Sequence, residues 1–158
     1  VDETSLKALV RHQPIILVPL GDAPLMKKLG FKTVIEHNTW QRTVVSLRRM
    51  DDQKKELSLS FISVPANHWS CRGLNDANKS LFLGWVVAPS SQQHAVYFAG
   101  DTAVLSEKDH RDILMNPNYG PISMNLVPGG PNHERDTMEN THASAAHGIY
   151  SHFYHLDL

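Results

Sequence analysis

The sequence predicts an α/β fold with a β-rich middle and helices at both ends, as in part of an αββα sandwich. Short apolar segments separated by turn residues run through the middle of the chain, which is the pattern of β-hairpins. Apolar residues at helical spacing occur near both ends. With 158 residues, of which 41% are hydrophobic, we expect one partial domain over residues 1–158.

The first predicted helix covers residues 4–11, where apolar side chains fall on one side. Thr4 or Ser5 is the expected N-cap, because a hydroxyl can accept a hydrogen bond from a free backbone N–H of the first turn. Pro14 ends the helix. The apolar run 15–18 then predicts a short strand.

A second helix is predicted over residues 23–29. Asp22 is the expected N-cap, and Gly30 supplies the stop signal at the other end. Residues 33–35 predict another brief strand.

Two hairpins are predicted in the middle of the chain, the first from residues 43–47 and 56–64 and the second from 80–88 and 95–99. In the first hairpin, apolar and polar residues alternate, which suggests one buried face. The apolar set is Leu57, Leu59 and Phe61, and it alternates with Ser58, Ser60 and Ile62.

The remaining elements are a helix over 107–115, a strand over 122–127 and a last helix from Thr141 or Ser144 to about Tyr154. Half to two-thirds of an αββα sandwich leaves a sheet edge and apolar surface uncovered. We therefore expect the chain to be unstable alone unless another segment, another chain or a second copy covers that surface.

Two polar residues follow apolar segments of the predicted sheet. His68 comes shortly after the segment 59–64, and Asp101 comes shortly after 95–98. A His and an Asp that are delivered by strand ends can meet over one edge of a sheet. An imidazole supplies a neutral nitrogen and a carboxylate can bridge two cations, so the pair predicts a binuclear zinc site.

Each of these residues also has a structural interpretation. His68 can be a loop histidine packed on Trp69, and Asp101 can end its strand in an Asx turn that Thr102 supports. The turn does not exclude metal binding, because a ligand carboxylate needs hydrogen-bonded support. The two motifs in this order favour the ligand interpretation.

These motifs, with Leu83-Gly84-Trp85-Val86-Val87 between them, resemble the metallo-β-lactamase superfamily. Within it, they resemble the branch of N-acyl-phosphatidylethanolamine-hydrolysing phospholipase D. Other segments that carry the resemblance are Val18-Pro19-Leu20-Gly21, Asn38-Thr39-Trp40, Tyr119-Gly120-Pro121, Leu126-Val127-Pro128-Gly129 and Met138-Glu139-Asn140-Thr141-His142.

The family's His-x-His-x-Asp-His motif, which supplies four ligands from one loop, does not occur in this sequence. In the family it comes directly before a segment like residues 1–9, and Asp2 would lie close enough to support it. The resemblance therefore implies that the remaining ligands come from a missing segment or a complementary chain. It carries over only His68 and Asp101 as metal ligands.

The resemblance implies a hydrolase in which two zinc ions make hydroxide available near neutral pH. His68 would bind one ion, and Asp101 would bridge both as the catalytic carboxylate. The implied substrate is a phosphodiester or related ester, such as an N-acyl phospholipid, reached by peripheral membrane contact. The alternative is a non-catalytic structural or scaffolding subunit of a larger assembly, so whether the chain is an enzyme stays open.

Two residues are implied as substrate-binding. Arg72 lies in a region that is basic and close to the pocket mouth in the related phospholipases, and its guanidinium could hold a phosphate by a bidentate contact. His142 matches a family histidine near the substrate pocket. A surface arginine and a solvent-exposed helix residue are the alternative interpretations. Four further histidines are expected at the surface: His12, His37, His94 and His110.

Three positions depart from the family pattern. Ala103 replaces the usual Gly, Ser123 replaces the usual Asp, and residues 129–131 differ from the family loop. These changes affect the shape of the pocket more than metal ligation, and they leave the identity of the substrate open.

Charge, hydropathy and cysteine content limit the kinds of partner and compartment that we expect. A formal net charge of −1 does not indicate a nucleic-acid partner. No apolar run approaches the ~20 residues that span a bilayer. Cys71 is the single cysteine, which excludes an internal disulfide framework and leads us to expect an intracellular, reducing compartment.

Overall fold

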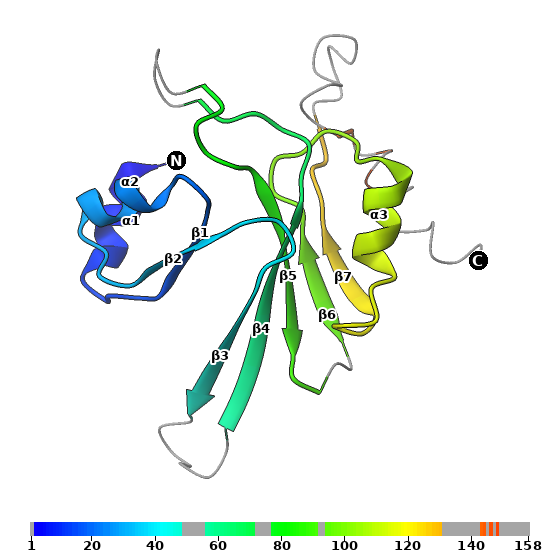
Figure 1. The fold of residues 1–158 in the computed structure, drawn as a ribbon, viewed down its shortest axis with the longest axis horizontal. Coiled ribbons are helices and arrows are strands. Elements are labelled where there is room, and N and C mark those ends of the chain that lie inside the picture. Colours follow the sequence, from blue (N-terminus) through cyan, green and yellow to red (C-terminus); the bar gives the residue numbers. More distant parts are fainter. Residues whose placement is uncertain are drawn as a thin grey trace. The chain divides into compact units, whose positions relative to one another are not determined.

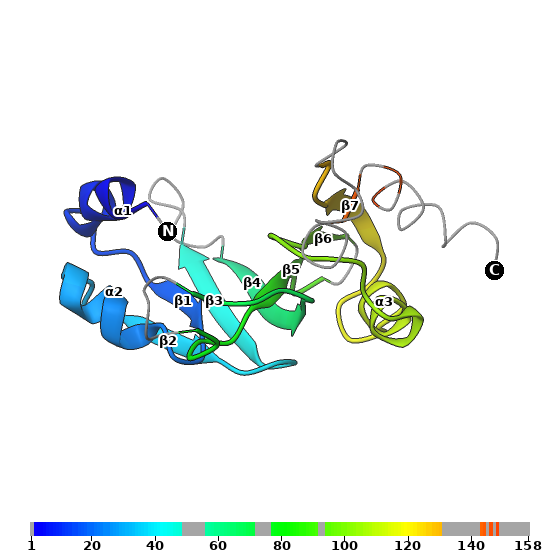
Figure 2. The same ribbon diagram turned by 90° about the horizontal axis from the view of Figure 1, so that it is seen from above.

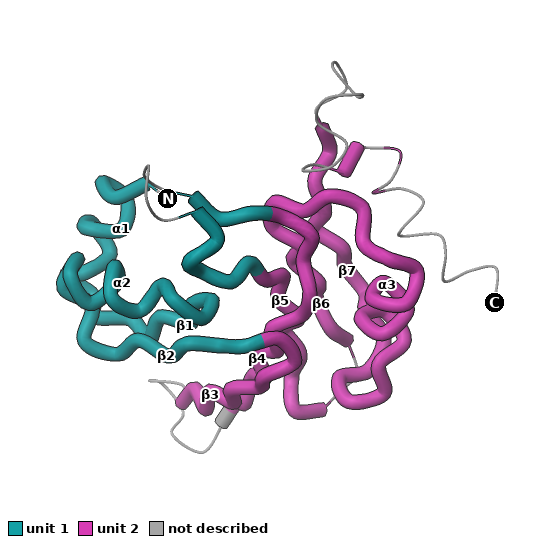
Figure 3. The backbone as a smooth tube through the Cα atoms, turned by 45° about the horizontal axis from the view of Figure 1, so that its top comes forward, with its two compact units in different colours: residues 1–38, 69–82 teal, residues 39–68, 83–158 magenta. Residues whose placement is uncertain are grey.

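The structure is a computed structural model and describes residues 2–48, 56–71, 77–91, 94–130, 143, 144, 146 and 148 (Figure 1). Its contacts divide the chain into two compact units (Figure 3). Unit 1 comprises Val1–Asn38 and Trp69–Phe82, and unit 2 comprises Thr39–His68 and Leu83–Leu158.

Unit 1 alternates helices and strands. Its elements are α1 (Glu3–Val10), β1 (Ile16–Pro19), α2 (Ala23–Leu29) and β2 (Val34–His37). The two strands pair in parallel, so the connection between them is the helix α2. The small core of this unit is built around Val18, Met26 and Phe31.

The helix ends of unit 1 differ in part from the expectation. Asp2, and neither Thr4 nor Ser5, caps α1, because its carboxylate accepts hydrogen bonds from the backbone N–H groups of those two residues at 3.1 and 3.2 Å. Gly30 ends α2 as expected. Its φ of 108° is left-handed backbone, which glycine adopts without a Cβ penalty.

The start of α2 is stabilised by a residue that is distant in sequence. Asp22 occupies the N-cap position, but its side chain makes no capping hydrogen bond. Instead, Oε1 of Glu36 on β2 accepts from the N–H groups of Gly21 and Ala23 at 2.8 and 3.0 Å. Asp22 therefore has the predicted N-cap position without the capping bond, and a carboxylate on β2 accepts from the N–H groups at the start of the helix instead.

Unit 2 is built on a five-stranded sheet with the order β3-β4-β5-β6-β7. The strands are β3 (Arg42–Arg48), β4 (Glu56–Pro65), β5 (Leu83–Pro89), β6 (Ala95–Phe98) and β7 (Ile122–Leu126). Strands β3 to β6 pair in antiparallel fashion, as the predicted hairpins require, and β7 pairs in parallel with β6. The chain crosses from β6 to β7 through α3 (Glu107–Leu114).

One face of this sheet carries the core of unit 2, and α3 packs against it (Figures 1 and 2). Val64 and Val86 are 0% exposed, and burying each contributes on the order of 1.5–3 kcal/mol. The other members of the cluster are Ile62, Ala88, Ala95, Tyr97, Ala99, Ile113, Leu114 and Tyr119.

The core face of β4 is not the one that its alternation suggested. Ser60 and Ile62 are buried, whereas Leu57 is exposed and Phe61 is half-buried. The hydroxyl of Ser60 is satisfied inside the sheet, because it accepts hydrogen bonds from the guanidinium of Arg42 at 2.6 and 3.0 Å. Both faces of β4 carry apolar residues, so the period of two could not tell which face meets α3.

Among the four histidines expected at the surface, His37 is an exception, because it is buried at the end of β2 with 1% exposure. The predicted last helix lies almost wholly outside the described residues. Every helix in the described ranges is too short and too polar to cross a lipid bilayer.

Candidate functional site

The register of the sheet places His68 and Asp101 at the same edge. Strands β4 and β6 both run antiparallel to β5, so the two strands share one direction. β4 ends at Pro65 and β6 ends at Phe98. His68 and Asp101 each follow their own strand by three residues, and both belong to unit 2.

The loops that carry these residues are joined by hydrogen bonds. We call residues 66–68 the β4 loop and residues 99–105 the β6 loop. The N–H of Asn67 donates to Oγ1 of Thr102 at 2.8 Å, and the N–H of Ala103 donates to the carbonyl oxygen of Asn67 at 2.7 Å. Nδ2 of Asn67 adds a bond of 3.2 Å to the carbonyl oxygen of Val104. Each candidate ligand is therefore the chain neighbour of a residue that bonds across to the other loop.

The two candidate ligands differ in their exposure. Asp101 is exposed, whereas His68 is half-buried and its Nε2 atom is shielded from solvent. Gly100, directly before Asp101, has a φ of 66°, which is left-handed backbone. The turn that presents the carboxylate at the sheet edge therefore favours a glycine at this position.

The donor atoms of His68 and Asp101 are of the types that bind zinc, but two ligands are fewer than a zinc site needs. Imidazole nitrogen and carboxylate oxygen are both zinc ligands, and a catalytic zinc site has at least three protein ligands. Within the described ranges, no three or more His, Cys, Asp or Glu side chains gather as a metal site. His68 and Asp101 would thus form part of a site, with further ligands from outside the described residues.

A third segment also meets the β6 loop. The N–H of Ala143 donates to the carbonyl oxygen of Thr102 at 2.7 Å. Ala143 directly follows His142, which was expected near the substrate. His142 itself and Arg72 lie outside the described residues, so their substrate-binding roles stay predictions.

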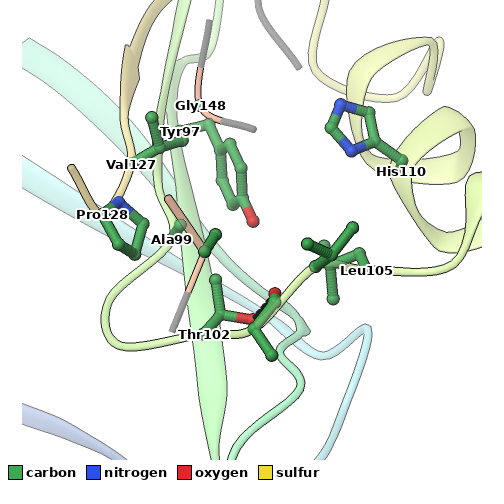
Figure 4. Close-up of a pocket in the computed structure, with 11 residues that line it drawn as sticks. Tyr97, Ala99, Thr102, Leu105, His110, Val127, Pro128 and Gly148 are labelled. Atoms are coloured by element: carbon green, nitrogen blue, oxygen red, sulfur yellow. Dashed lines mark hydrogen bonds between the residues drawn. The ribbon is translucent and has the colours of Figure 1, made fainter. Parts of the chain in front are cut away.

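A small cavity of about 40 Å³ lies behind the β6 loop, inside unit 2 (Figure 4). Thr102, Ala99 and Leu105 contribute to its wall, and the hydroxyl of Tyr97 points into it. Small-molecule pockets usually measure about 300–1,000 Å³, so this cavity is too small for a phospholipid head group.

Sequence reasoning missed two residues of this cavity. Burial raises the pKa of Tyr97 well above its ordinary value, so its phenol stays protonated in the fold. His110 lines the cavity from α3 and is half-buried, although a surface position was expected. Tyr97 lies on the core-facing side of β6, and His110 faces inward from the helix. Their presence in one cavity depends on how α3 packs on the sheet.

The sequence of the chain is similar to that of known proteins. The sequence profile of the beta-lactamase superfamily domain matches residues 2–154. N-acyl-phosphatidylethanolamine-hydrolyzing phospholipase D 1 of Caenorhabditis elegans is 26% identical over 159 residues, which cover 96% of this chain and 41% of that protein. The mitochondrial N-acyl-phosphatidylethanolamine-hydrolyzing phospholipase D of Saccharomyces cerevisiae is 31% identical over 98 residues, which cover 61% of this chain and 19% of that protein.

The chain thus spans less than half the length of these two relatives. The profile, by contrast, extends over nearly the whole chain and includes both loops of the candidate site. By this match, and with the mixed α/β fold described above, the chain belongs to the metallo-β-lactamase superfamily.

Proposed function

We propose that this chain is part of a zinc-dependent hydrolase that cleaves phosphodiesters or related esters, with N-acyl phospholipids as the first substrate class to test. The observation that carries the proposal is the placement of His68 and Asp101 on two hydrogen-bonded loops at one sheet edge. The names of the two relatives supply the substrate class.

His68 and Asp101 would have different roles at this edge of the sheet. His68 would offer a neutral imidazole nitrogen, and Asp101 would offer a carboxylate that solvent and substrate can reach. Zinc, when bound, lowers the pKa of a coordinated water and stabilises negative charge on phosphoryl oxygens. The hydrogen bonds between the β4 and β6 loops would hold the two ligand-bearing backbones in place before metal binds.

Further ligands, in this proposal, come from a segment or complementary chain outside the described residues. Arg72 would hold a substrate phosphate, and His142 would lie beside the substrate. The substrate would be met at a membrane surface by peripheral contact. These roles rest on the family resemblance.

The test uses the whole polypeptide that contains this chain. Its zinc content is measured by mass spectrometry, and release of N-acylethanolamine from vesicles that contain N-acyl-phosphatidylethanolamine is followed with and without a chelator. We expect zinc to be bound and hydrolysis to be chelator-sensitive. Bound zinc without hydrolysis of this lipid or of a simple aryl phosphodiester would favour the scaffold alternative, and absence of zinc would overturn the proposal.

A further inference from the structure

Thr102 is the point at which three segments of unit 2 meet. Its hydroxyl oxygen accepts from the N–H of Asn67 at 2.8 Å and lies 2.8 Å from the carbonyl oxygen of Ala103, to which it donates. Its own carbonyl oxygen accepts from the N–H of Ala143 at 2.7 Å. The residue is 4% exposed, so water does not compete effectively for these bonds.

The hydrogen bonds of Thr102 connect the backbones next to the two candidate ligands. Thr102 follows Asp101 directly, and its partner Asn67 directly precedes His68. One hydroxyl group therefore joins the backbones next to both candidate ligands across 35 residues of sequence. Asn67 and Thr102 lie on loops, and this bond acts together with the bonds from the N–H of Ala103 and from Nδ2 of Asn67 to hold the two loops to each other.

We propose that Thr102 is a positioning residue, which sets the separation of His68 and Asp101 before a metal binds and ties the segment at Ala143 to the same point. The inference rests on the proposed function. Groups that hydrogen-bond around metal ligands typically change metal affinity by about 10–100-fold when they are removed. Thr102 acts one residue away from a ligand, through the backbone and not through the carboxylate.

The decisive variant is Thr102→Val in the whole polypeptide that contains this chain. Valine has nearly the same shape but no hydroxyl, so the N–H of Asn67 loses its acceptor while the packing is kept. We expect Co²⁺, used as a spectroscopic probe for the zinc site, to bind about 10–100-fold more weakly. The visible absorption bands of the cobalt complex should also shift, because the ligand geometry changes.

Three further variants separate positioning from general stability. Thr102→Ser keeps the hydroxyl, so its Co²⁺ affinity and its visible absorption bands should match those of the parent protein. Asn67→Ala keeps the backbone N–H that meets Thr102 and loses only the 3.2 Å side-chain bond to Val104, so its effect should be small. Ser106→Ala removes the hydroxyl that caps α3 and should lower stability without changing cobalt affinity.

A measurement without metal completes the test. In the metal-free protein, the amide of Asn67 should be protected from hydrogen exchange, and Thr102→Val should remove that protection. If Co²⁺ does not bind the parent protein, the proposed function fails. If it binds the parent and Thr102→Val with the same affinity and spectrum, only the positioning role of Thr102 is overturned.

Discussion

The backbone N–H of Ala103 lies 2.7 Å from the carbonyl oxygen of Asn67 and donates to it. This bond joins the β6 loop to the β4 loop without using any side chain. Ala103 stands where the family usually has glycine, and it is 2% exposed, so its methyl group is accommodated inside unit 2. The departure from the family pattern therefore leaves the connection between the loops intact.

Replacing Ala103 with the family's glycine tests whether the methyl group affects the connection between the loops. Ala103→Gly keeps the backbone donor, loses one buried methyl group and gives the unfolded chain more freedom. We expect the free energy of unfolding to fall by about 1–2 kcal/mol, with metal affinity unchanged. Urea unfolding and a cobalt titration of the same preparation check both parts. A loss of metal affinity would mean that the methyl group itself shapes the site.

The carboxylate of Asp101 is expected to be necessary for turnover and dispensable for the fold. Asp101→Asn removes the negative charge that would offset two cations, but the side chain is exposed, so unfolding should change by no more than about 0.5 kcal/mol. Hydrolysis of the phosphodiester substrate should fall by more than about 100-fold, beyond the usual effect of residues that merely support ligands.

Asp112→Asn is the matched control for that experiment. Asp112 pairs with Lys108 at 2.6 Å on the exposed side of α3, one helical turn apart. Exposed pairs of this kind are worth about 0–1 kcal/mol, so neither fold nor activity should change appreciably. Full activity of Asp101→Asn in a protein that still holds two zinc ions would refute the proposed role of the carboxylate.

Local signals in the sequence predicted most of the elements. The helix over 23–29 was expected with the bounds that α2 has, because Pro24 near its start and Gly30 at its end are both local stop or start signals. The hairpin strands were expected within a few residues of β3 to β6, since turn residues separate them. The parallel pairing of β7 with β6 places α3 on the sheet and depends on long-range packing.

The sequence indicated that His68 and Asp101 follow strand ends, and their metal-binding role stays a prediction. It did not indicate the hydrogen bonds that connect their loops. His68 and Asp101 follow strand ends and match a family pattern, so the sequence pointed to them directly. The bond between Asn67 and Thr102 spans 35 residues and exists only because β4, β5 and β6 pair in one register. The cap of α1 was misplaced because Asp2 and two hydroxyl residues compete for the same role at its start.

Gly84 should be intolerant of a side chain for reasons of packing. A Cβ there would lie 3.1 Å from the carbonyl oxygen of Phe98 and 3.2 Å from atoms of Tyr97 and Val64. We expect Gly84→Ala to lower the free energy of unfolding by about 1–3 kcal/mol through overpacking. Gly129→Ala is the control, because a Cβ at Gly129 meets nothing within 4 Å. Equal stability of the two variants in urea would contradict the packing of β5 against β6.

Acid should loosen the start of α1. Hydrogen bonds from Ser5 and Thr4 hold the pKa of Asp2 below its ordinary value of 3.8. A depressed pKa in the folded state stabilises the helix above pH 3.8, and this contribution is lost as the pH falls through the folded value. The amide resonances of Thr4 and Ser5 should therefore move below pH 3.8, and Asp2→Ala should abolish that transition. Unchanged resonances in the acid range would argue against the cap.

Alkali should unfold unit 2 through its buried tyrosines. Burial raises the pKa of Tyr97 and of Tyr119 far above the ordinary value of 10.0, and for Tyr119 the neighbouring Tyr97 and Asp112 add to the shift. The hydroxyl of Tyr119 donates to the carbonyl oxygen of Ile113, a bond that requires the proton.

Because both pKa values are raised on folding, the neutral phenols contribute stability that is fully present below pH 10 and is lost as the pH rises toward the folded values. The ultraviolet absorbance of these phenolates should thus appear together with the loss of circular dichroism, in one cooperative step above pH 10. Tyr97→Phe removes one of the two groups and should make the decline in stability with pH less steep. Titration of both tyrosines near pH 10 in a protein that stays folded would mean that their hydroxyl groups reach solvent, and would contradict the burial of Tyr97 and Tyr119.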